Sequence, residues 1–270
     1  METLHGIELK QDEYIKDSLI YCKECHTPRS IYLKVGLRRC LCDCLSKKRD
    51  NEDKLREEKE RLHEAEKLRI SSLIGERYRN VSFETTETGF NKTFDNALER
   101  CSRYCWISKK VLEHGMGIYL HGDTGTGKTH ITACMANELL KKNHSVLFTN
   151  FFEISKAIKG TFGKSNETEN DYINRLANID FLFIDDLGTE RVQNSEGDLW
   201  MQEKIFDVLN RRYNNNKPTI FTSNHNLSEL VNERGFMRKT VDRIAEMSTA
   251  IIKIEGQSYR IKKRTKDAPF

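Results

Sequence analysis

The chain has 270 residues, of which 32% are charged and 37% are hydrophobic, and its formal net charge at pH 7 is +4. This length predicts one large domain with a small appendage, and the low apolar share predicts a charge-rich segment outside the core. No apolar run approaches the roughly 18 residues that cross a bilayer, and the N-terminus is too polar for a secretion signal. These features exclude membrane-spanning, collagen-like and wholly disordered proteins, and they predict a cytoplasmic location.

The first region, residues 1–45, contains five of the eight cysteines. They form one pair and one group of three: Cys22, Cys25, Cys40, Cys42 and Cys44. In a reducing compartment such clusters more often hold metal than form disulfides. Zinc takes four soft ligands in a tetrahedron, so we expect a zinc module with a short hairpin between the two groups. The expected ligands are Cys22, Cys25, Cys42 and Cys44, with Cys40 as the alternate. The alternative is a set of unrelated thiols without metal.

The second region, residues 46–74, is dominated by charge, with 17 charged residues among the 25 of 46–70 and no glycine or proline. This pattern predicts a helical linker. It is either a solvated spacer or a docking helix for a partner.

The third region, residues 75–270, alternates short apolar runs with longer amphipathic stretches. The runs predict strands at 117–121, 145–149, 180–185 and 218–222. The stretches predict helices at 128–142, at 197–214 and, in two pieces, over 151–178. A polar segment at 160–172 predicts a loop or a broken helix. The alternation predicts an α/β domain with a parallel sheet covered by helices on both faces.

Residues 122–129, GDTGTGKT, match the phosphate-binding pattern G-x-x-x-x-G-K-[ST] between a predicted strand and a predicted helix. The glycines allow a tight turn whose N–H groups face phosphate oxygens. Lys128 supplies a charge for the β- and γ-phosphates, and Thr129 supplies a hydroxyl for Mg²⁺. The motif predicts ATP binding by Gly122, Asp123, Thr124, Gly125, Thr126, Gly127, Lys128, Thr129 and His130.

Two further elements fit the same site. Asp185 and Asp186 end an apolar run, at the strand edge where open α/β sheets bind ligands. We expect Asp185 to hold Mg²⁺ and Asp186 to orient or deprotonate the attacking water. Asn224 follows the next predicted strand and is interpreted as a sensor of the γ-phosphate, the alternative being a helix cap.

From about residue 75 to 265 the chain resembles the AAA+ ATPases of the DnaC/DnaI/IstB group, which are helicase loaders and transposition helpers. The resemblance rests on GDTGTGKTH, FLFIDDLG, RRYNNNKPTIFTSN, VDRI and SYR. It implies that Arg243 is an arginine finger for a neighbouring subunit and that Arg260 is a sensor arginine in cis. Many such ATPases carry Glu at the position of Asp186. Phage-type relatives often have a Cys-rich module before the ATPase, and in the loaders the N-terminal module contacts the helicase.

Three other cysteines, Cys101, Cys105 and Cys134, are interpreted as buried small apolar residues. Phe90, Tyr104 and Trp106 are expected to pack the lid of the ATPase or to shape an adenine pocket.

The leading functional hypothesis is a factor that uses slow ATP hydrolysis to load a DnaB-type hexameric helicase onto single-stranded DNA. It would self-associate through the ATPase domain and contact DNA through residues 156–164 and the basic tail. The alternatives are a transposition helper ATPase and a nucleotide-binding zinc adaptor without productive turnover.

Overall fold

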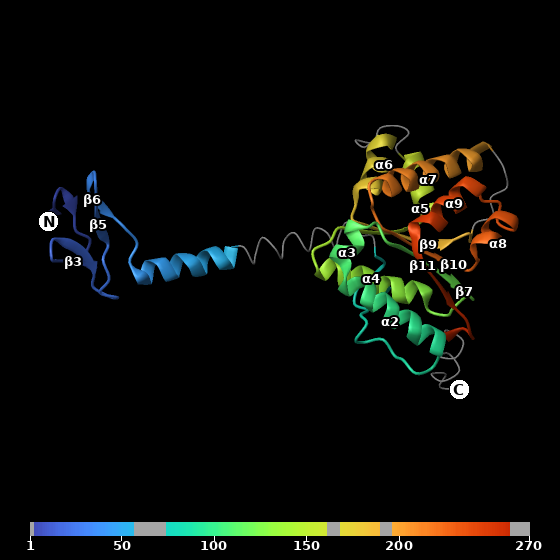
Figure 1. Cartoon of the computed structure of the whole chain (residues 1–270), viewed down its shortest axis with the longest axis horizontal. Coiled ribbons are helices and arrows are strands. Elements are labelled where there is room, and N and C mark those ends of the chain that lie inside the picture. The colour runs from blue at the N-terminus through green and yellow to red at the C-terminus, as the bar shows by residue number, and fades with distance from the viewer. Residues whose placement is uncertain (1–2, 57–73, 161–167, 190–195, 260–270) are drawn as a thin grey trace. The chain divides into compact units, whose positions relative to one another are not determined.

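The computed structural model describes residues 3–56, 74–160, 168–189 and 196–259. The chain divides into two compact units, Met1–Glu64 and Ala65–Phe270 (Figure 1). The helical character predicted for the linker is confirmed for residues 46–56, which belong to a helix over 43–56. Residues 57–73 of that linker lie outside the described part of the chain, and the three-part division at 45 and 74 remains a prediction.

In its described residues, 3–56, the N-terminal unit has three small antiparallel hairpins followed by the helix over 43–56. The hairpins are β1–β2 (Thr3–Leu4, Ile7–Glu8), β3–β4 (Glu13–Lys16, Leu19–Cys22) and β5–β6 (Ser30–Leu33, Gly36–Arg39). The short hairpin predicted between the two cysteine groups is confirmed as β5–β6. Within residues 3–56 the buried apolar residues are few: Ile20, Cys22, Leu37 and Cys42. So small a core makes a metal staple physically reasonable.

The second unit is built on a five-stranded sheet in the order β11-β7-β10-β9-β8. All four neighbouring pairs are parallel. The strands are β7 (Gly117–Gly122), β8 (Val146–Asn150), β9 (Phe181–Leu187), β10 (Thr219–Ser223) and β11 (Ser248–Ile254). The predicted α/β class and parallel sheet are confirmed. The four predicted strands are β7 to β10.

Helices cover both faces of this sheet (Figure 1). One face packs against α2 (Lys92–Trp106), α3 (Ser108–Glu113) and α4 (Lys128–Lys141). The other packs against α5 (Phe151–Gly160), α6 (Glu169–Asn178), α7 (Glu196–Asn214), α8 (Leu227–Asn232) and α9 (Arg238–Met247). Along β9, Phe181 and Phe183 enter the first core while Leu182 and Ile184 enter the second. Burial on both faces explains why the sequence shows continuous apolar runs.

One strand was missed by the sequence analysis. The fifth strand, β11, lies outside the predicted set, because along this edge strand exposed side chains interrupt the buried ones and no solid apolar run forms. The two helical pieces predicted over 151–178 are α5 and α6, and α6 begins at Glu169, inside the polar segment predicted as a loop or a broken helix. Thr168 caps this helix by exchanging hydrogen bonds with Asp171, which makes a polar sequence a helix start.

The three cysteines assigned to the core are fully buried, as expected: Cys101, Cys105 and Cys134. A short 3-10 turn, η1 (Glu76–Tyr78), precedes α2. Among the described helices, none combines the length and the apolar character that a bilayer-spanning segment needs.

Candidate functional site

The phosphate-binding loop connects β7 to α4. Its three glycines have positive φ angles, 137° at Gly122, 81° at Gly125 and 99° at Gly127, a region that residues with side chains rarely adopt. A Cβ on Gly122 would also lie 2.0 Å from the carbonyl oxygen of Ile254. The helix α4 begins at Lys128 and places its positive N-terminal end against the loop. The backbone therefore has the conformation that phosphate binding requires.

Lys128 lies inside this loop and is 5% exposed. Its Nζ donates hydrogen bonds to the carbonyl oxygens of Gly122 at 2.7 Å and Asp123 at 2.8 Å. The hydroxyl of Thr126 donates to the same Asp123 carbonyl at 2.8 Å. The ammonium group is thus positioned at the centre of the loop, where phosphate oxygens could take the place of carbonyl acceptors.

Two further residues assigned to the loop region, Thr124 and His130, differ in their surroundings. Thr124 is exposed at the loop tip. The Nε2 atom of His130 lies 2.9 Å from the hydroxyl oxygen of Thr86, and burial lowers the pKa of the His130 imidazole. Through this contact a neutral His130 links α4 to the segment that precedes α2.

Asp185 lies at the carboxyl end of β9 and meets the phosphate loop through Thr129. The hydroxyl of Thr129 donates to Asp185 Oδ1 at 3.2 Å, and the hydroxyl of Thr222 donates to the same oxygen at 2.5 Å. Burial raises the pKa of Asp185 to about 6, and the nearby Asp186 carboxylate adds to the rise, while the two hydroxyls oppose it. A hydroxyl and a carboxylate oxygen suit Mg²⁺, so Thr129 and Asp185 fit the metal-holding roles predicted for them.

Thr222 is a residue of this site that the sequence analysis missed. Besides its bond to Asp185, its hydroxyl accepts a hydrogen bond from the backbone N–H of Asp186 at 2.9 Å. The predicted sensor, Asn224, follows β10 and is half-buried, and no hydrogen bond of its side chain is found within the described residues. The signal for Thr222 was its place at the end of an apolar run. Its partner could be known only from the pairing of β10 with β9.

The chain beyond β11 returns across the phosphate loop. The N–H of Tyr259 donates to the carbonyl oxygen of Gly125 at 3.0 Å, and a Cβ on Gly125 would lie 2.2 Å from the Oγ of Ser258. The Tyr259 ring packs on that of Phe90, with centroids 4.8 Å apart, so Phe90 does lie beside the loop. Trp106 does not, because it ends α2 with 83% of its surface exposed. Its assignment to the lid is wrong.

The arginine assigned as a finger, Arg243, lies on α9. Its guanidinium packs over the ring of Tyr213 at 4.1 Å and donates to Glu246 at 2.7 Å. These contacts hold the side chain between α7 and α9, where 20% of it is exposed. Arg234 instead donates to the backbone carbonyl of Thr189, just after β9.

Several predicted contacts lie outside the described residues. They are the sensor arginine Arg260, residues 161–164 of the proposed DNA-contacting stretch, and the basic tail 261–270. Residues 156–160 of that stretch belong to α5.

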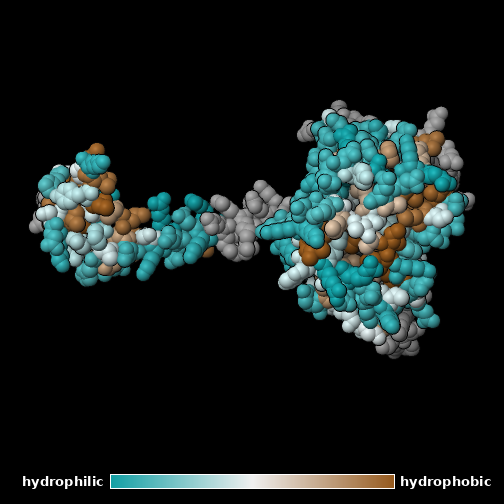
Figure 2. Space-filling view, viewed as in Figure 1, coloured by the Kyte–Doolittle hydropathy of each residue, from teal (hydrophilic) through white to brown (hydrophobic). Residues whose placement is uncertain are grey.

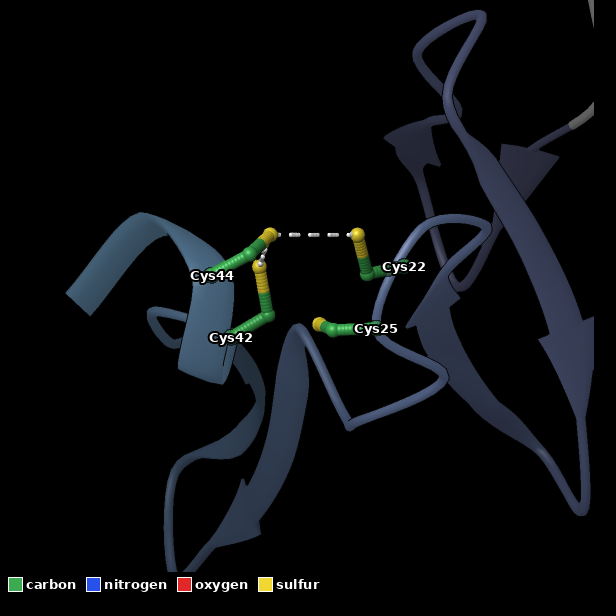
Figure 3. Close-up of side chains that lie close together, drawn as sticks. All are labelled: Cys22, Cys25, Cys42 and Cys44. Carbon is green, nitrogen blue, oxygen red and sulfur yellow. Dashed lines mark hydrogen bonds between the residues drawn. The ribbon is translucent and has the colours of Figure 1, made fainter. Parts of the chain in front are cut away.

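The N-terminal unit brings four cysteine sulfur atoms together from its two cysteine groups (Figure 3). The sulfurs of Cys22, Cys25, Cys42 and Cys44 all lie within 4.8 Å of one another. Four ligands around zinc at about 2.3 Å leave their sulfurs a little under 4 Å apart, so this group fits a tetrahedral metal. Cys40 is exposed, and its thiol donates to the carbonyl oxygen of Pro28 at 3.5 Å. It lies outside the group of four.

Comparison with known proteins agrees with this geometry. The chain is 32% identical over 139 residues to the replicative helicase loader DnaC of Escherichia coli K12, a match that covers 52% of this chain and 54% of that protein. The match therefore spans only about half of that relative's length. The PBSX protein XkdC of Bacillus subtilis 168, from a phage-like element, is 29% identical over 198 residues, which cover 72% of each chain.

The fold is also known from solved structures. The crystal structure of DnaI superposes with a TM-score of 0.54 and 25% identity, covering 69% of this chain and 94% of that one. The resemblance to the DnaC/DnaI/IstB group is thus confirmed, as is the AAA+ fold. The profile of the family described as IstB-like ATP binding protein matches residues 52–267, and the chain belongs to that family.

Proposed function

We propose that this protein is an ATPase that loads a ring-shaped, DnaB-type replicative helicase onto single-stranded DNA. The observation that carries the proposal is the hydrogen bond from Thr129, at the end of the phosphate loop, to Asp185, in a chain similar to a protein named as a replicative helicase loader. In this proposal Lys128 binds phosphate, Thr129 and Asp185 hold Mg²⁺, and Asp186 acts on the attacking water.

A chain with this site would act as a switch rather than as a fast metabolic enzyme. ATP binding would order an interface between copies, and Arg243 would complete the site of the next copy. Arg243 lies on α9, where its partly exposed side chain contacts Tyr213 and Glu246, and this position is compatible with a role in trans. Asn224 and Arg260 are proposed to respond to the γ-phosphate within each copy.

The N-terminal unit is proposed to hold zinc and to bind the helicase. Hydrophobic side chains lie at its surface (Figure 2). In the β5–β6 hairpin alone, Ile31, Tyr32, Leu33 and Val35 are each about half exposed or more. Exposed apolar groups in so small a unit favour contact with a protein partner.

A pull-down of the tagged full chain from a lysate of its own host tests this function. We expect a DnaB-type helicase as the main partner in the presence of ATP and Mg²⁺, and its loss with Lys128→Ala. Capture of a transposase would instead assign the transposition-helper role that the IstB family description keeps open. ATP turnover should rise when single-stranded DNA is added. A complete lack of turnover would favour the adaptor hypothesis.

A further inference from the structure

Arg29 is a buried cation that touches the cysteine cluster of the N-terminal unit. It is 4% exposed, and its backbone is fixed by hydrogen bonds to Ile20 at 2.6 Å and from Cys40 at 2.8 Å. Its Nε donates to the sulfur of Cys42 at 3.2 Å, and its Nη2 donates to the sulfur of Cys22 at 3.1 Å. One planar guanidinium thus bridges two of the four sulfurs.

The remaining edge of Arg29 faces acids. Its Nη1 donates to Asp12 at 2.5 Å and to the buried Glu13 at 3.4 Å. Glu13 is also bound by Arg39 at 2.6 Å. The two acids offset part of the cost of burying the guanidinium, and hydrogen bonds to neutral thiols would offset little of the rest. Those to thiolates are charge-assisted and much stronger. The placement of Arg29 is therefore suited to deprotonated, metal-bound cysteines.

The four sulfurs fall into different classes by their hydrogen bonds. The sulfurs of Cys22 and Cys42 accept hydrogen bonds from Arg29, and the two residues are 0% and 1% exposed. Cys25 lies 3.0 Å from the hydroxyl of Thr27. The side-chain contacts found for the Cys44 sulfur in the described structure are with other cysteines of the group, Cys42 at 3.2 Å and Cys22 at 3.6 Å. Cys44 is also only half-buried.

We propose that Arg29 compensates the charge of a zinc centre formed by these cysteines and that it leaves Cys44 as the sulfur where reagents attack. Zinc with four thiolates carries two formal negative charges, and Arg29 places against two of the sulfurs a positive charge that it shares with Asp12 and Glu13. Hydrogen bonds to a thiolate also withdraw electron density and lower its nucleophilicity. The least protected sulfur is then the reactive one. This inference rests on the zinc binding proposed above.

The first test measures zinc release from the full-length, zinc-loaded protein. Excess chelator is added, and the freed metal is followed with a chromogenic indicator. Replacing a partner of a metal ligand typically costs 10–100-fold in metal affinity, so Arg29→Gln should release zinc at least about tenfold faster. Arg29→Lys keeps the charge but cannot bridge both sulfurs, and its rate should fall between those of Arg29→Gln and the wild type. Arg39→Gln is the matched control, because Arg39 binds Glu13 without touching sulfur.

A second test avoids any substitution of Arg29 and so does not depend on how its variants fold. The Cys40→Ser protein removes the exposed thiol that would consume reagent first. The zinc-loaded chain is treated with less than one equivalent of N-ethylmaleimide, and the modified cysteine is identified by peptide mass spectrometry. In the reaction the thiolate sulfur forms a bond to an alkene carbon, the neighbouring carbon takes a proton from water, and the zinc–sulfur bond breaks. The first label should be on Cys44.

The outcomes distinguish a failure of the zinc site from a failure of the roles proposed for Arg29 and Cys44. A wild-type protein purified without zinc, and unable to bind it, would overturn the metal site and this inference with it. If zinc is bound but Arg29→Gln releases it no faster than Arg39→Gln, Arg29 has no compensating role. A first label on Cys22, Cys25 or Cys42 would overturn the assignment of Cys44.

Discussion

The hydroxyl of Thr222 is the contact that joins the two acids of the nucleotide site, and Thr222→Val tests its role. Valine keeps the shape of the side chain and replaces the hydroxyl with a methyl group. The residue is 1% exposed, so water cannot easily replace the lost group. Two hydrogen bonds disappear, one to the Asp185 carboxylate and one from the N–H of Asp186.

The size of the effect follows from these two bonds. An unpaired buried N–H costs about 1–3 kcal/mol, which for a domain of this size lowers the melting temperature by roughly 2–10 °C. The bond to a charged carboxylate contributes about 1.5–3 kcal/mol to its ionised form. Its loss should raise the pKa of Asp185 from about 6 to roughly 7–8.

The pH dependence of Mg²⁺ binding follows from the raised pKa of Asp185. The pKa of Asp185 in the folded protein lies above its ordinary value of 3.8, so the metal-free fold binds the proton more tightly than the unfolded chain does. The contribution of this proton to the stability of the fold is lost as the pH rises through about 6. Mg²⁺ needs the ionised form and therefore competes with the proton. In the wild type, Mg²⁺-dependent nucleotide binding should weaken as the pH falls through about 6.

Titration of a fluorescent ATP analogue with Mg²⁺ across roughly pH 5 to 9 measures this midpoint. For Thr222→Val the midpoint should move up by about one to two pH units. Thr240→Val is the matched control, because Thr240 is equally buried and its hydroxyl has no hydrogen-bond partner within the described residues. An unchanged midpoint in Thr222→Val would refute the reasoning.

Three other substitutions give separate outcomes. Lys128→Ala should abolish ATP binding, measured by calorimetry, and retained tight binding would refute the phosphate site. Arg243→Ala should spare ATP binding but reduce turnover about 10²-fold or more in assemblies; equal turnover at high protein concentration would remove Arg243 as the finger. Arg212→Met should lower the free energy of unfolding by about 3 kcal/mol or more, because the fully buried guanidinium of Arg212 donates to several backbone carbonyls. Urea denaturation measures this loss, and a change under about 1 kcal/mol would contradict it.

The parts of the fold that the sequence predicted well are those set by local spacing. The phosphate loop, the buried runs of β7 to β10 and the two cysteine groups each lie within a short stretch of chain. Glycine positions and apolar periodicity determine such features almost alone. The four sulfurs meet because one hairpin brings the second group back to the first.

The parts that could not be predicted depend on contacts between distant segments. Thr222 reaches Asp185 only because β10 lies beside β9 in the sheet, and strand order is not encoded in either strand. Arg29 is one of many basic residues in the sequence, and its burial against Cys22 and Cys42 appears only when the hairpins pack. The edge strand β11 has one exposed row of side chains, which weakens its apolar pattern.

The backbone at Asp186 favours aspartate over glutamate at this position. Its φ is +54°, in the left-handed region that aspartate and asparagine tolerate better than longer residues, and its N–H is held in place by Thr222. Glutamate here would reach further into the site but would strain the backbone. Asp186→Asn should therefore keep the fold and nucleotide affinity while turnover drops about 10²-fold or more. Asp186→Glu should cost stability instead, and a glutamate variant as stable as the wild type would show that the backbone does not select the shorter acid.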